Sequence, residues 1–227
     1  MKALAAHPKF DTLADIVAAL GGIPPHRIRF RPYPGTAEEY HLSDVSIPNI
    51  RACELIDGTL VEKAMGIRSE YIGMWIATIF GRFPDIDDVG AILGSQAYLR
   101  LFPGTVRMPD VAFIRWDSMA DPDELEDPAG AFLDTAPDLI VEVLSPGNTA
   151  GEMTRKLGEY ATAGVKIVWI VDPETQTVEV FTKAKLKHKK TYTIGDTLDG
   201  GKVLPGFTLP VETIFAKRAP GKGKKKR

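Results

Sequence analysis

Residues 138–145 (DLIVEVLS) carry apolar side chains on both faces of an extended strand, and this pattern most restricts the folds open to the chain. Leu139, Val141 and Val143 point to one side of such a strand, because successive side chains alternate. Ile140 points to the opposite side. Strands that are apolar on both faces are typical of a sheet that is covered on both sides. The sequence therefore predicts a layered protein with this strand in its central sheet.

The segments around this strand predict further strands and helices. Thr149 and Glu152 fit a capping box at the start of a helix over 150–163, and a glycine fits its C-terminal stop. The other predicted elements are helices at 11–20 and 67–83, a β-hairpin at 52–63 around Asp57-Gly58, and strands at 96–102, 106–115, 166–171 and 177–182. This order indicates an α/β (α+β) fold, in which a mixed central sheet is flanked by helices.

The length of 227 residues fits one large domain with appendages. We predict an N-terminal helical and proline-rich extension at 1–51, a core domain at 52–216 and a disordered basic tail at 217–227. No apolar run approaches the roughly 18–20 residues of a membrane helix, and the first residues contain no secretory apolar core. We therefore expect no membrane contact and a cytoplasmic location.

Basic residues are concentrated in two segments, 183–190 with five lysines and 217–227 with seven basic residues, and neither segment contains an acid. Together they hold twelve of the 28 Lys and Arg residues, so the rest of the chain has 16 basic against 30 acidic side chains. Segments of this kind neutralise nucleic-acid phosphates, or else form a solvated surface and a disordered tail. Both interpretations stay open at this point.

Carboxylates are the groups through which this chain is expected to hold any metal. Cys53 is the only cysteine, and the four histidines are scattered without zinc spacing. Glu142 lies in the middle of the doubly apolar strand, on the same face as Ile140 and Leu144. A buried glutamate needs a cation, because an unpaired buried charge is costly. The alternatives are a structural salt bridge or a strand end that reaches solvent.

A second carboxylate at such a site must come from a neighbouring strand. Asp138 lies on the same strand as Glu142, roughly 13 Å away at the rise of a strand, which is too far to share one ion. Asp110 is the best-placed candidate, because it opens the apolar strand DVAFIR and shares a face with Ala112 and Ile114. The alternative is an ordinary turn aspartate, since the dipeptide Pro-Asp occurs elsewhere in the chain.

Lys156 is the candidate basic group. In the predicted helix it lies at the edge of the buried stripe, between Met153 and Tyr160. The helix directly follows the strand of Glu142, so the ammonium and the carboxylate can meet. The alternative is an ordinary surface lysine.

Residues 106–173 resemble the Uma2 family, also called DUF820, which belongs to the PD-(D/E)XK nuclease superfamily. The segments that carry the resemblance are PDVAFI and PDLIVEVLSPGNTAGEMTRKLGEYATAGVKIVWIVDP. It extends more weakly from about Glu54 to Phe215. The resemblance implies a restriction-endonuclease-like fold that binds Mg²⁺ (or Mn²⁺) through Asp110 and Glu142.

One position departs from the signature of the superfamily. The signature places a lysine two residues after the glutamate, where this chain has Leu144. In Uma2-like proteins the lysine lies in the next helix, which points to Lys156. By the same resemblance, Glu54 and Glu70 are auxiliary acidic residues of the site. The alternative for either glutamate is a solvated side chain.

The resemblance implies a metal-dependent endonuclease that hydrolyses phosphodiester bonds of nucleic acid, with DNA as the expected partner. Lys156 would position or deprotonate the attacking water, or stabilise developing negative charge. One alternative is a non-catalytic module of the same fold that binds nucleic acid or protein. Another is a Mg²⁺ hydrolase acting on a nucleotide, although the chain has no phosphate-cradling glycine loop. Nuclease domains of this size often dimerise, so a homodimer is a candidate assembly.

Overall fold

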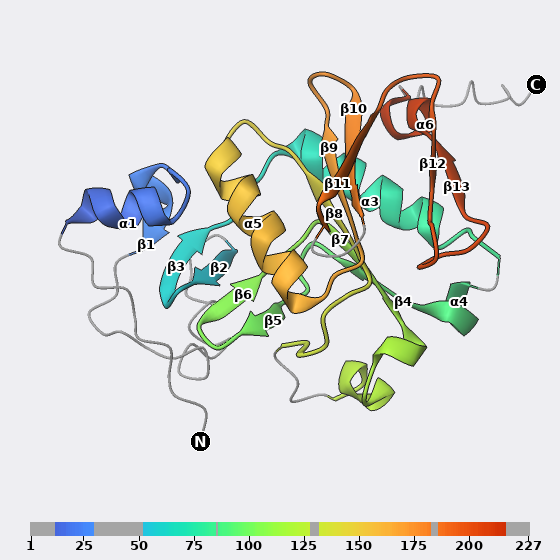
Figure 1. The fold of residues 1–227 in the computed structure, drawn as a ribbon, viewed down its shortest axis with the longest axis horizontal. Coiled ribbons are helices and arrows are strands. Elements are labelled where there is room, and N and C mark those ends of the chain that lie inside the picture. The colour runs from blue at the N-terminus through green and yellow to red at the C-terminus, as the bar shows by residue number, and fades with distance from the viewer. Residues whose placement is uncertain (1–11, 30–51, 85, 128–131, 183–185, 217–227) are drawn as a thin grey trace, which may run out of the picture.

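The computed structural model describes residues 12–29, 52–84, 86–127, 132–182 and 186–216. Within these ranges the centre is a six-stranded sheet of order β11-β10-β9-β8-β7-β4. Its strands are β4 (Gly90–Gly94), β7 (Val111–Arg115), β8 (Leu139–Val143), β9 (Ile167–Asp172), β10 (Thr177–Thr182) and β11 (His188–Tyr192). Strands β8 and β9 run parallel, and the other neighbouring pairs are antiparallel. The predicted mixed central sheet is therefore confirmed (Figure 1).

Two smaller sheets and several helices complete the described part. The second sheet has the order β1-β3-β2-β6-β5, and β12 pairs with β13. These strands are β1 (Ile28–Arg29), β2 (Cys53–Ile56), β3 (Thr59–Glu62), β5 (Leu99–Phe102), β6 (Thr105–Arg107), β12 (Thr197–Asp199) and β13 (Thr208–Pro210). The helices are α1 (Leu13–Ala19), α3 (Ile67–Phe80), α4 (Ile86–Val89), α5 (Ala150–Ala163) and α6 (Val211–Phe215), with 3₁₀ turns at Pro25–Arg27, Trp116–Ser118 and Pro122–Leu125. None of the helices in the described ranges has the length and apolar character needed to cross a membrane.

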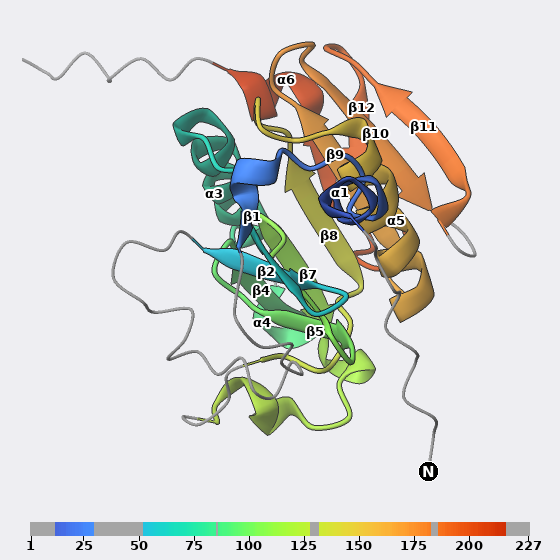
Figure 2. The same cartoon turned by 90° about the vertical axis from the view of Figure 1, so that its left-hand side faces the viewer.

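Helices cover both faces of the central sheet. Helix α3 packs against β4, β7 and β8. On this face Leu139, Val141 and Val143 of β8 join the larger apolar cluster. On the other face Ile140 packs in a second cluster with Tyr160 of α5. Figure 2 shows α3 and α5 on opposite sides of β8. The alternation predicted for this strand is confirmed.

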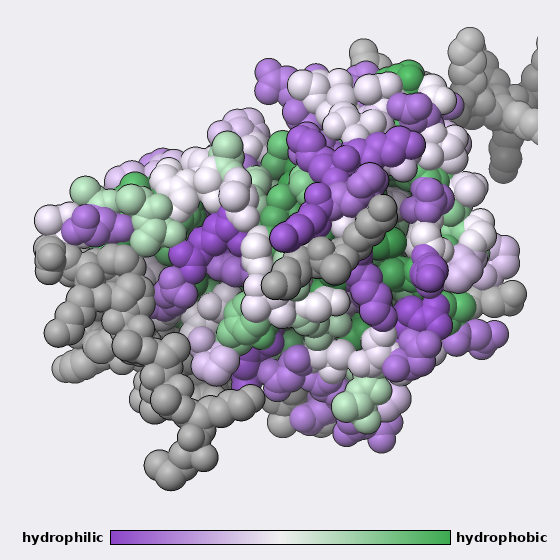
Figure 3. Space-filling view, in the orientation of Figure 1, coloured by the Kyte–Doolittle hydropathy of each residue, from purple (hydrophilic) through white to green (hydrophobic). Residues whose placement is uncertain are grey.

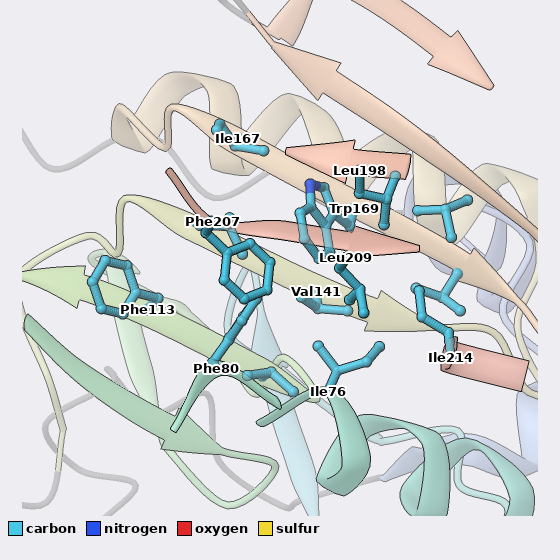
Figure 4. Packing of buried hydrophobic residues seen from close by; sticks show 14 of the residues in the cluster. Ile76, Phe80, Phe113, Val141, Ile167, Trp169, Leu198, Phe207, Leu209 and Ile214 are labelled. Atoms are coloured by element: carbon cyan, nitrogen blue, oxygen red, sulfur yellow. The ribbon is translucent and has the colours of Figure 1, made fainter. Parts of the chain in front are cut away.

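Aromatic rings fill the core between α3 and the sheet. The ring of Phe80 lies edge-on to Phe207 with 5.0 Å between centroids, and its centroid is 5.6 Å from that of Trp169. Val141 of β8 and Ile214 of α6 belong to the same cluster (Figure 4). Burying a large apolar side chain contributes about 1.5–3 kcal/mol. This packing therefore fixes β8, which carries Glu142, within the sheet.

The prediction of a single strand over 106–115 is wrong, because the structure divides these residues between strands of two different sheets. Strand β6 pairs with β2 and β5 in the second sheet, whereas β7 pairs with β4 and β8 in the central sheet. The break falls at Met108-Pro109-Asp110. Proline has no N–H for a strand ladder, so the chain leaves one sheet here and enters the other. Asp110 consequently lies at the crossing point between the sheets.

Several short elements were not predicted from the sequence. Strand β4 has five residues, of which the first and last are glycines, and β12 and β13 have three residues each. Strand β11 reads HKKTY and has no apolar face, so it forms because β10 supplies its hydrogen-bond partner. Such strands depend on their neighbours more than on their own side chains.

Residues 12–29 pack against the start of α5. Arg27 donates hydrogen bonds to both carboxylate oxygens of Glu152, the residue that closes the capping box of α5. The Thr149 hydroxyl donates to the carbonyl oxygen of Gly21 at 2.7 Å. The rest of the predicted N-terminal extension, and the whole basic tail, lie outside the described residues, and the domain boundaries stay predictions.

The close approach of Gly21 to Gly151 predicts a sensitive position. A Cβ added to Gly151 would lie less than 3.0 Å from the carbonyl oxygen of Gly21. We expect Gly151→Ala to lower the free energy of unfolding by about 1–3 kcal/mol, because the backbone must shift. The matched control is Gly158→Ala in the same helix, where a Cβ meets nothing within 4 Å. That substitution should raise stability by about 0.5–1 kcal/mol. Urea denaturation measures both, and equal effects would contradict the expectation.

Candidate active site

Glu142 lies near the end of β8 and is buried, with 4% of its surface exposed. Both of its carboxylate oxygens accept from the Lys156 ammonium, at 3.0 and 3.1 Å. The Tyr160 hydroxyl donates to one of the same oxygens. Lys156 and Tyr160 lie one helical turn apart on α5, so the helix presents both donors to the strand. The predicted meeting of Glu142 and Lys156 is therefore present in the structure.

Lys156 also binds a second carboxylate, that of Glu54 in β2. The distance from its ammonium nitrogen to Glu54 Oε1 is 3.0 Å. The other oxygen of Glu54 pairs with Arg107 at 2.7 Å, and the Met108 N–H also donates to this carboxylate. Lys156 is 2% exposed and Glu54 is 1% exposed. The expectation that Lys156 lies at the edge of the buried stripe is corrected, because these acids draw it into the interior.

Asp110 is held by two donors at the crossing between the sheets. Its Oδ2 accepts from the N–H of Val143 at 2.7 Å, which ties it to the residue after Glu142. Its Oδ1 lies 2.8 Å from the ammonium nitrogen of Lys63. The charge of Asp110 is also close enough to raise the pKa of Glu142. Asp110 thus joins the group formed by Glu142 and Lys156 without touching Lys156.

A cavity of about 470 Å³ opens beside Asp110. Its lining consists of two residues of α3 and of residues in the segments before β2, between β3 and α3, between β4 and β5, and between β6 and β7. They are Ala52, Lys63, Ala64, Met65, Gly66, Ser69, Glu70, Ser95, Gln96, Tyr98, Met108 and Asp110. Glu142, Lys156 and Glu54 are not part of this lining, so Asp110 is the acid of the central group that faces the cavity.

Glu70 is placed differently from the other predicted acids. It is exposed in the first turn of α3 and lines the cavity. Its carboxylate accepts from the Ser95 hydroxyl at 3.1 Å. No contact joins it to Glu142 or Lys156 among the described residues. The structure therefore brings together Glu54, Asp110, Glu142 and Lys156, and leaves Glu70 at the cavity wall.

Burial and neighbouring charges change the pKa values of Glu142 and Lys156. Burial raises the pKa of Glu142, with Lys156 opposing and Asp110 and Glu54 adding to the rise. Burial disfavours the Lys156 ammonium, yet Glu142 and Glu54 together raise its pKa above the ordinary value. Lys156 is therefore an ammonium at neutral pH. The charged form of Glu142 would be favoured further by any additional cation close to it.

The ionisation of Glu54 predicts a sensitivity to acid. Burial opposes its charge, but Lys156 and Arg107 lower its pKa from 4.5 to about 2. A carboxyl whose pKa is lower in the folded state stabilises the protein above its unfolded pKa, and this stability is lost as the pH falls toward the folded value. We expect a loss on the order of 3 kcal/mol from this group between about pH 5 and pH 2.

The Glu54→Gln variant isolates that effect, because its amide does not ionise. It should be less stable than the wild type at neutral pH and should lose less stability over the same acid interval. Urea denaturation at a series of pH values gives both curves. Parallel losses in the two proteins would show that Glu54 is not the group responsible.

Two charged residues of this group were not singled out in the sequence. Arg107 is fully buried, where it binds Glu54 and also Glu159 of α5 at 2.6 Å. Lys63 follows β3 and pairs with Asp110. The criterion that selected Glu142, a charged side chain inside a predicted strand, also applies to Arg107, whereas Lys63 is the last residue of the predicted hairpin at 52–63. The partner of each charge lies on a distant segment, so the pairing itself has no local signal.

The basic segment 183–190 lies partly outside the described residues. Its described lysines include Lys189 and Lys190, which are exposed on the edge strand β11. Lys189 pairs with Glu179 at 2.6 Å and lines a groove of about 590 Å³ between α5 and β10. Figure 3 shows a hydrophilic surface over β10 and β11. This surface is positively charged only in part, because Glu179 offsets Lys189.

The chemistry of the acids fits a hard divalent ion better than other metals. Carboxylate oxygens suit Mg²⁺ or Mn²⁺, and Mg²⁺ is usually held by one or two carboxylates, with water and substrate phosphate completing its ligands. In the described ranges no group of three or more His, Cys, Asp or Glu side chains is arranged to hold an ion. Asp110 and Glu142 each have an ammonium within 3.0 Å, so positive charge is already favoured at both carboxylates.

Comparison with known proteins gives a family-model match and similar solved structures. The model of the Uma2 family, described as "Putative restriction endonuclease", matches residues 37–212. A crystal structure from Anabaena variabilis ATCC 29413, described as "a putative nuclease belonging to DUF820", is similar with a TM-score of 0.63 and 19% sequence identity. The similarity covers 77% of this chain and 97% of that one. No curated protein matches the chain.

These matches agree with the resemblance found in the sequence. At 19% identity the crystal structure shows the fold alone. The family model spans well over half of the chain and includes Glu54, Asp110, Glu142 and Lys156. The chain therefore has the fold of its DUF820 neighbour and belongs to the Uma2 family, whose description is "Putative restriction endonuclease".

Proposed function

We propose that this protein is a Mg²⁺-dependent endonuclease that hydrolyses phosphodiester bonds of DNA. The observation that carries the proposal is the convergence of three residues next to an open cavity: Asp110 directly before β7, Glu142 of β8 and Lys156 of α5. Two acids and a lysine that neighbouring strands and the helix α5 bring together suit this chemistry. Family membership adds support, because the family is described in terms of restriction endonucleases.

Asp110 and Glu142 would hold the ion. When bound, a divalent ion polarises the scissile phosphate and lowers the pKa of water. Asp110 is the acid of this pair that lines the cavity, and the Val143 N–H fixes the orientation of its carboxylate. Of the roles expected for Lys156, its raised pKa favours a charged group over a base. Buried between Glu54 and Glu142, Lys156 positions the Glu142 carboxylate.

DNA is the proposed substrate, with the exposed lysines of β11 as candidate phosphate contacts. Counterion release by such lysines makes binding depend on salt. The acidity of the remaining chain opposes binding to a polyanion. A steep loss of affinity with rising salt would support contacts of this kind. A homodimer that cuts both strands stays a prediction, as does the cytoplasmic location.

A non-catalytic module is the second candidate, and one observation favours it. Both acids are already neutralised by lysines, Asp110 by Lys63 and Glu142 by Lys156. A site of this kind can persist as a set of structural ion pairs. Such a protein would bind nucleic acid or protein and would cleave nothing.

Cleavage of supercoiled plasmid DNA by the wild-type protein tests the two candidates. The proposal expects nicked and linear products with Mg²⁺ or Mn²⁺, and intact plasmid with EDTA. Retarded but uncut DNA under every divalent ion would favour the non-catalytic module. If DNA is neither bound nor cut and RNA is cleaved, the proposed DNA substrate is wrong and RNA replaces it.

Glu70 is expected to matter less than the central acids. It is exposed, and an exposed charge interacts with its surroundings by about 1 kcal/mol or less. Glu70→Gln should therefore lower the rate of Mg²⁺-dependent cleavage by less than about tenfold. Initial rates of plasmid nicking give the comparison. A loss as large as that caused by substituting Asp110 would place Glu70 among the residues that hold the ion.

A further inference from the structure

Lys63 and Asp110 both line the cavity, and the Lys63 ammonium binds one carboxylate oxygen of Asp110. Its ammonium nitrogen lies 2.8 Å from Asp110 Oδ1, while Oδ2 accepts from the backbone of Val143. The backbone N–H of Lys63 donates to the carbonyl oxygen of Ala52 at 2.8 Å, which anchors the chain at this point. The backbone of Lys63 is therefore held by this hydrogen bond, and its long side chain extends along the cavity lining to Asp110.

Lys63 and Lys156 differ in where they can move. Lys156 is enclosed between two carboxylates and is not part of the cavity lining. Lys63 binds one carboxylate and lines a cavity of about 470 Å³. A lysine has a flexible four-carbon stem, so its ammonium can leave Asp110 without a change in the backbone.

The charges that line the cavity indicate a second partner for Lys63, a phosphate group of the substrate. Among the described residues of this lining, Lys63 is the one lysine or arginine, and Asp110 and Glu70 are the acids. A phosphodiester that enters beside Asp110 meets two negative side chains. It needs a positive contact in addition to the ion, because like charges repel in a confined site.

We propose that Lys63 is an exchangeable partner of Asp110 that becomes a ligand of the substrate phosphate. Without a divalent ion, the Lys63 ammonium holds the Asp110 carboxylate. When the ion binds Asp110, Lys63 is displaced into the cavity and binds the phosphodiester. This inference rests on the proposed function, because it requires a divalent ion at Asp110.

Binding of Mn²⁺, followed by electron paramagnetic resonance of the free ion, tests the exchange without measuring activity. Lys63→Gln removes the competing charge, so it should bind Mn²⁺ roughly tenfold more tightly than the wild type. Lys63→Arg keeps the charge and should stay close to the wild type. The matched control is Lys166→Gln, which removes a lysine that pairs with Asp138 away from the cavity. It should leave Mn²⁺ affinity unchanged.

Binding of a DNA duplex in Ca²⁺, followed by fluorescence anisotropy, tests the second half of the inference. Lys63→Gln should weaken this binding roughly tenfold, since a charge-assisted contact to phosphate is lost. The same variant therefore gains affinity for the ion and loses affinity for the polyanion. A lysine with only a structural role would not move the two affinities in opposite directions.

Amine labelling of the wild type keeps the test valid if Lys63→Gln fails to fold. Acetylation by a water-soluble ester, read by peptide mass spectrometry, reports how accessible each lysine is. Mg²⁺ should increase the labelling rate of Lys63 severalfold, because Lys63 is 8% exposed while it is paired with Asp110. The labelling rate of Lys166 should not change.

The results separate failure of the inference from failure of the proposed function. If the wild type binds Mn²⁺ and Asp110→Asn does not, but Lys63→Gln binds no more tightly and Mg²⁺ leaves Lys63 labelling unchanged, the exchange is wrong and the metal site stands. If neither the wild type nor any variant binds Mn²⁺, the proposed metal-dependent function is itself wrong.

Discussion

Replacing Asp110 by asparagine is expected to reduce Mg²⁺-dependent cleavage by about a thousandfold or more, with the protein still folded. The substitution keeps the shape of the side chain and removes the charge that faces the cavity. Loss of the ion removes several kcal/mol of charge stabilisation, and each 1.36 kcal/mol corresponds to about tenfold in rate. Initial rates of plasmid nicking measure the effect, with circular dichroism and urea denaturation to establish folding.

Asp138→Asn is a closely matched control for that experiment. Asp138 is also buried, accepts a backbone N–H, from Arg115 at 2.8 Å, and pairs with a lysine, Lys166. It directly precedes β8, at the end of the strand opposite to Glu142, and it does not line the cavity. Both variants should lose about 1–3 kcal/mol of stability from disturbed hydrogen bonds. Only Asp110→Asn should lose cleavage, and equal losses of cleavage would indicate that Asp110 has a structural role.

Lys156→Met is expected to have the largest effect on stability. It leaves the Glu142 carboxylate buried without its ammonium partner and removes one of the partners of Glu54. Removing one partner of a buried ion pair costs about 3–5 kcal/mol, a large part of the stability of a domain. Urea denaturation measures the loss at neutral pH. A change below about 1 kcal/mol would show that these groups are less enclosed than the structure indicates.

The double variant Glu142→Gln/Lys156→Met separates stability from catalysis. It removes the charges of both partners, and Glu54 keeps its pair with Arg107. Neutral replacement of a buried ion pair is often close to neutral for stability. We therefore expect the double variant to regain most of the stability lost in Lys156→Met and to remain inactive in the plasmid assay. Recovery of cleavage together with stability would show that the pair serves only the fold.

The central part of the fold followed from local patterns in the sequence. The two apolar faces of 138–145 predicted a central strand, and Thr149 and Glu152 predicted the start of α5, which the structure confirms. These signals are strong because alternation and capping act within a few residues. Asp57-Gly58 likewise predicted the turn between β2 and β3, and both residues have positive φ values in the structure.

The parts that sequence reasoning missed depend on distant contacts. Nothing within 106–115 shows that β6 and β7 belong to different sheets, apart from Pro109, because the partner strands β2 and β8 lie far away in the chain. Strand β11 has no apolar alternation and depends on β10 for its pairing. Register and partner choice are tertiary properties, and local propensity does not specify them.

The sequence likewise predicted the acids and the lysine of the candidate site but not all of their partners. Asp110, Glu142 and Lys156 were selected because charged residues beside apolar segments require partners, and the structure brings them together. The identity of those partners did not follow from this reasoning. Lys63 reaches Asp110 from the hairpin of the second sheet, and pairing at such a separation depends on how the two sheets meet.

A crystal structure of the wild-type protein grown with Mn²⁺, with anomalous scattering recorded at the manganese edge, tests the shared metal site most directly. We expect one strong anomalous peak in contact with the carboxylates of both Asp110 and Glu142, and no such peak in Asp110→Asn. Density for the Lys63 ammonium at Asp110 Oδ1, with no anomalous peak at either carboxylate at saturating Mn²⁺, would contradict the metal-dependent mechanism.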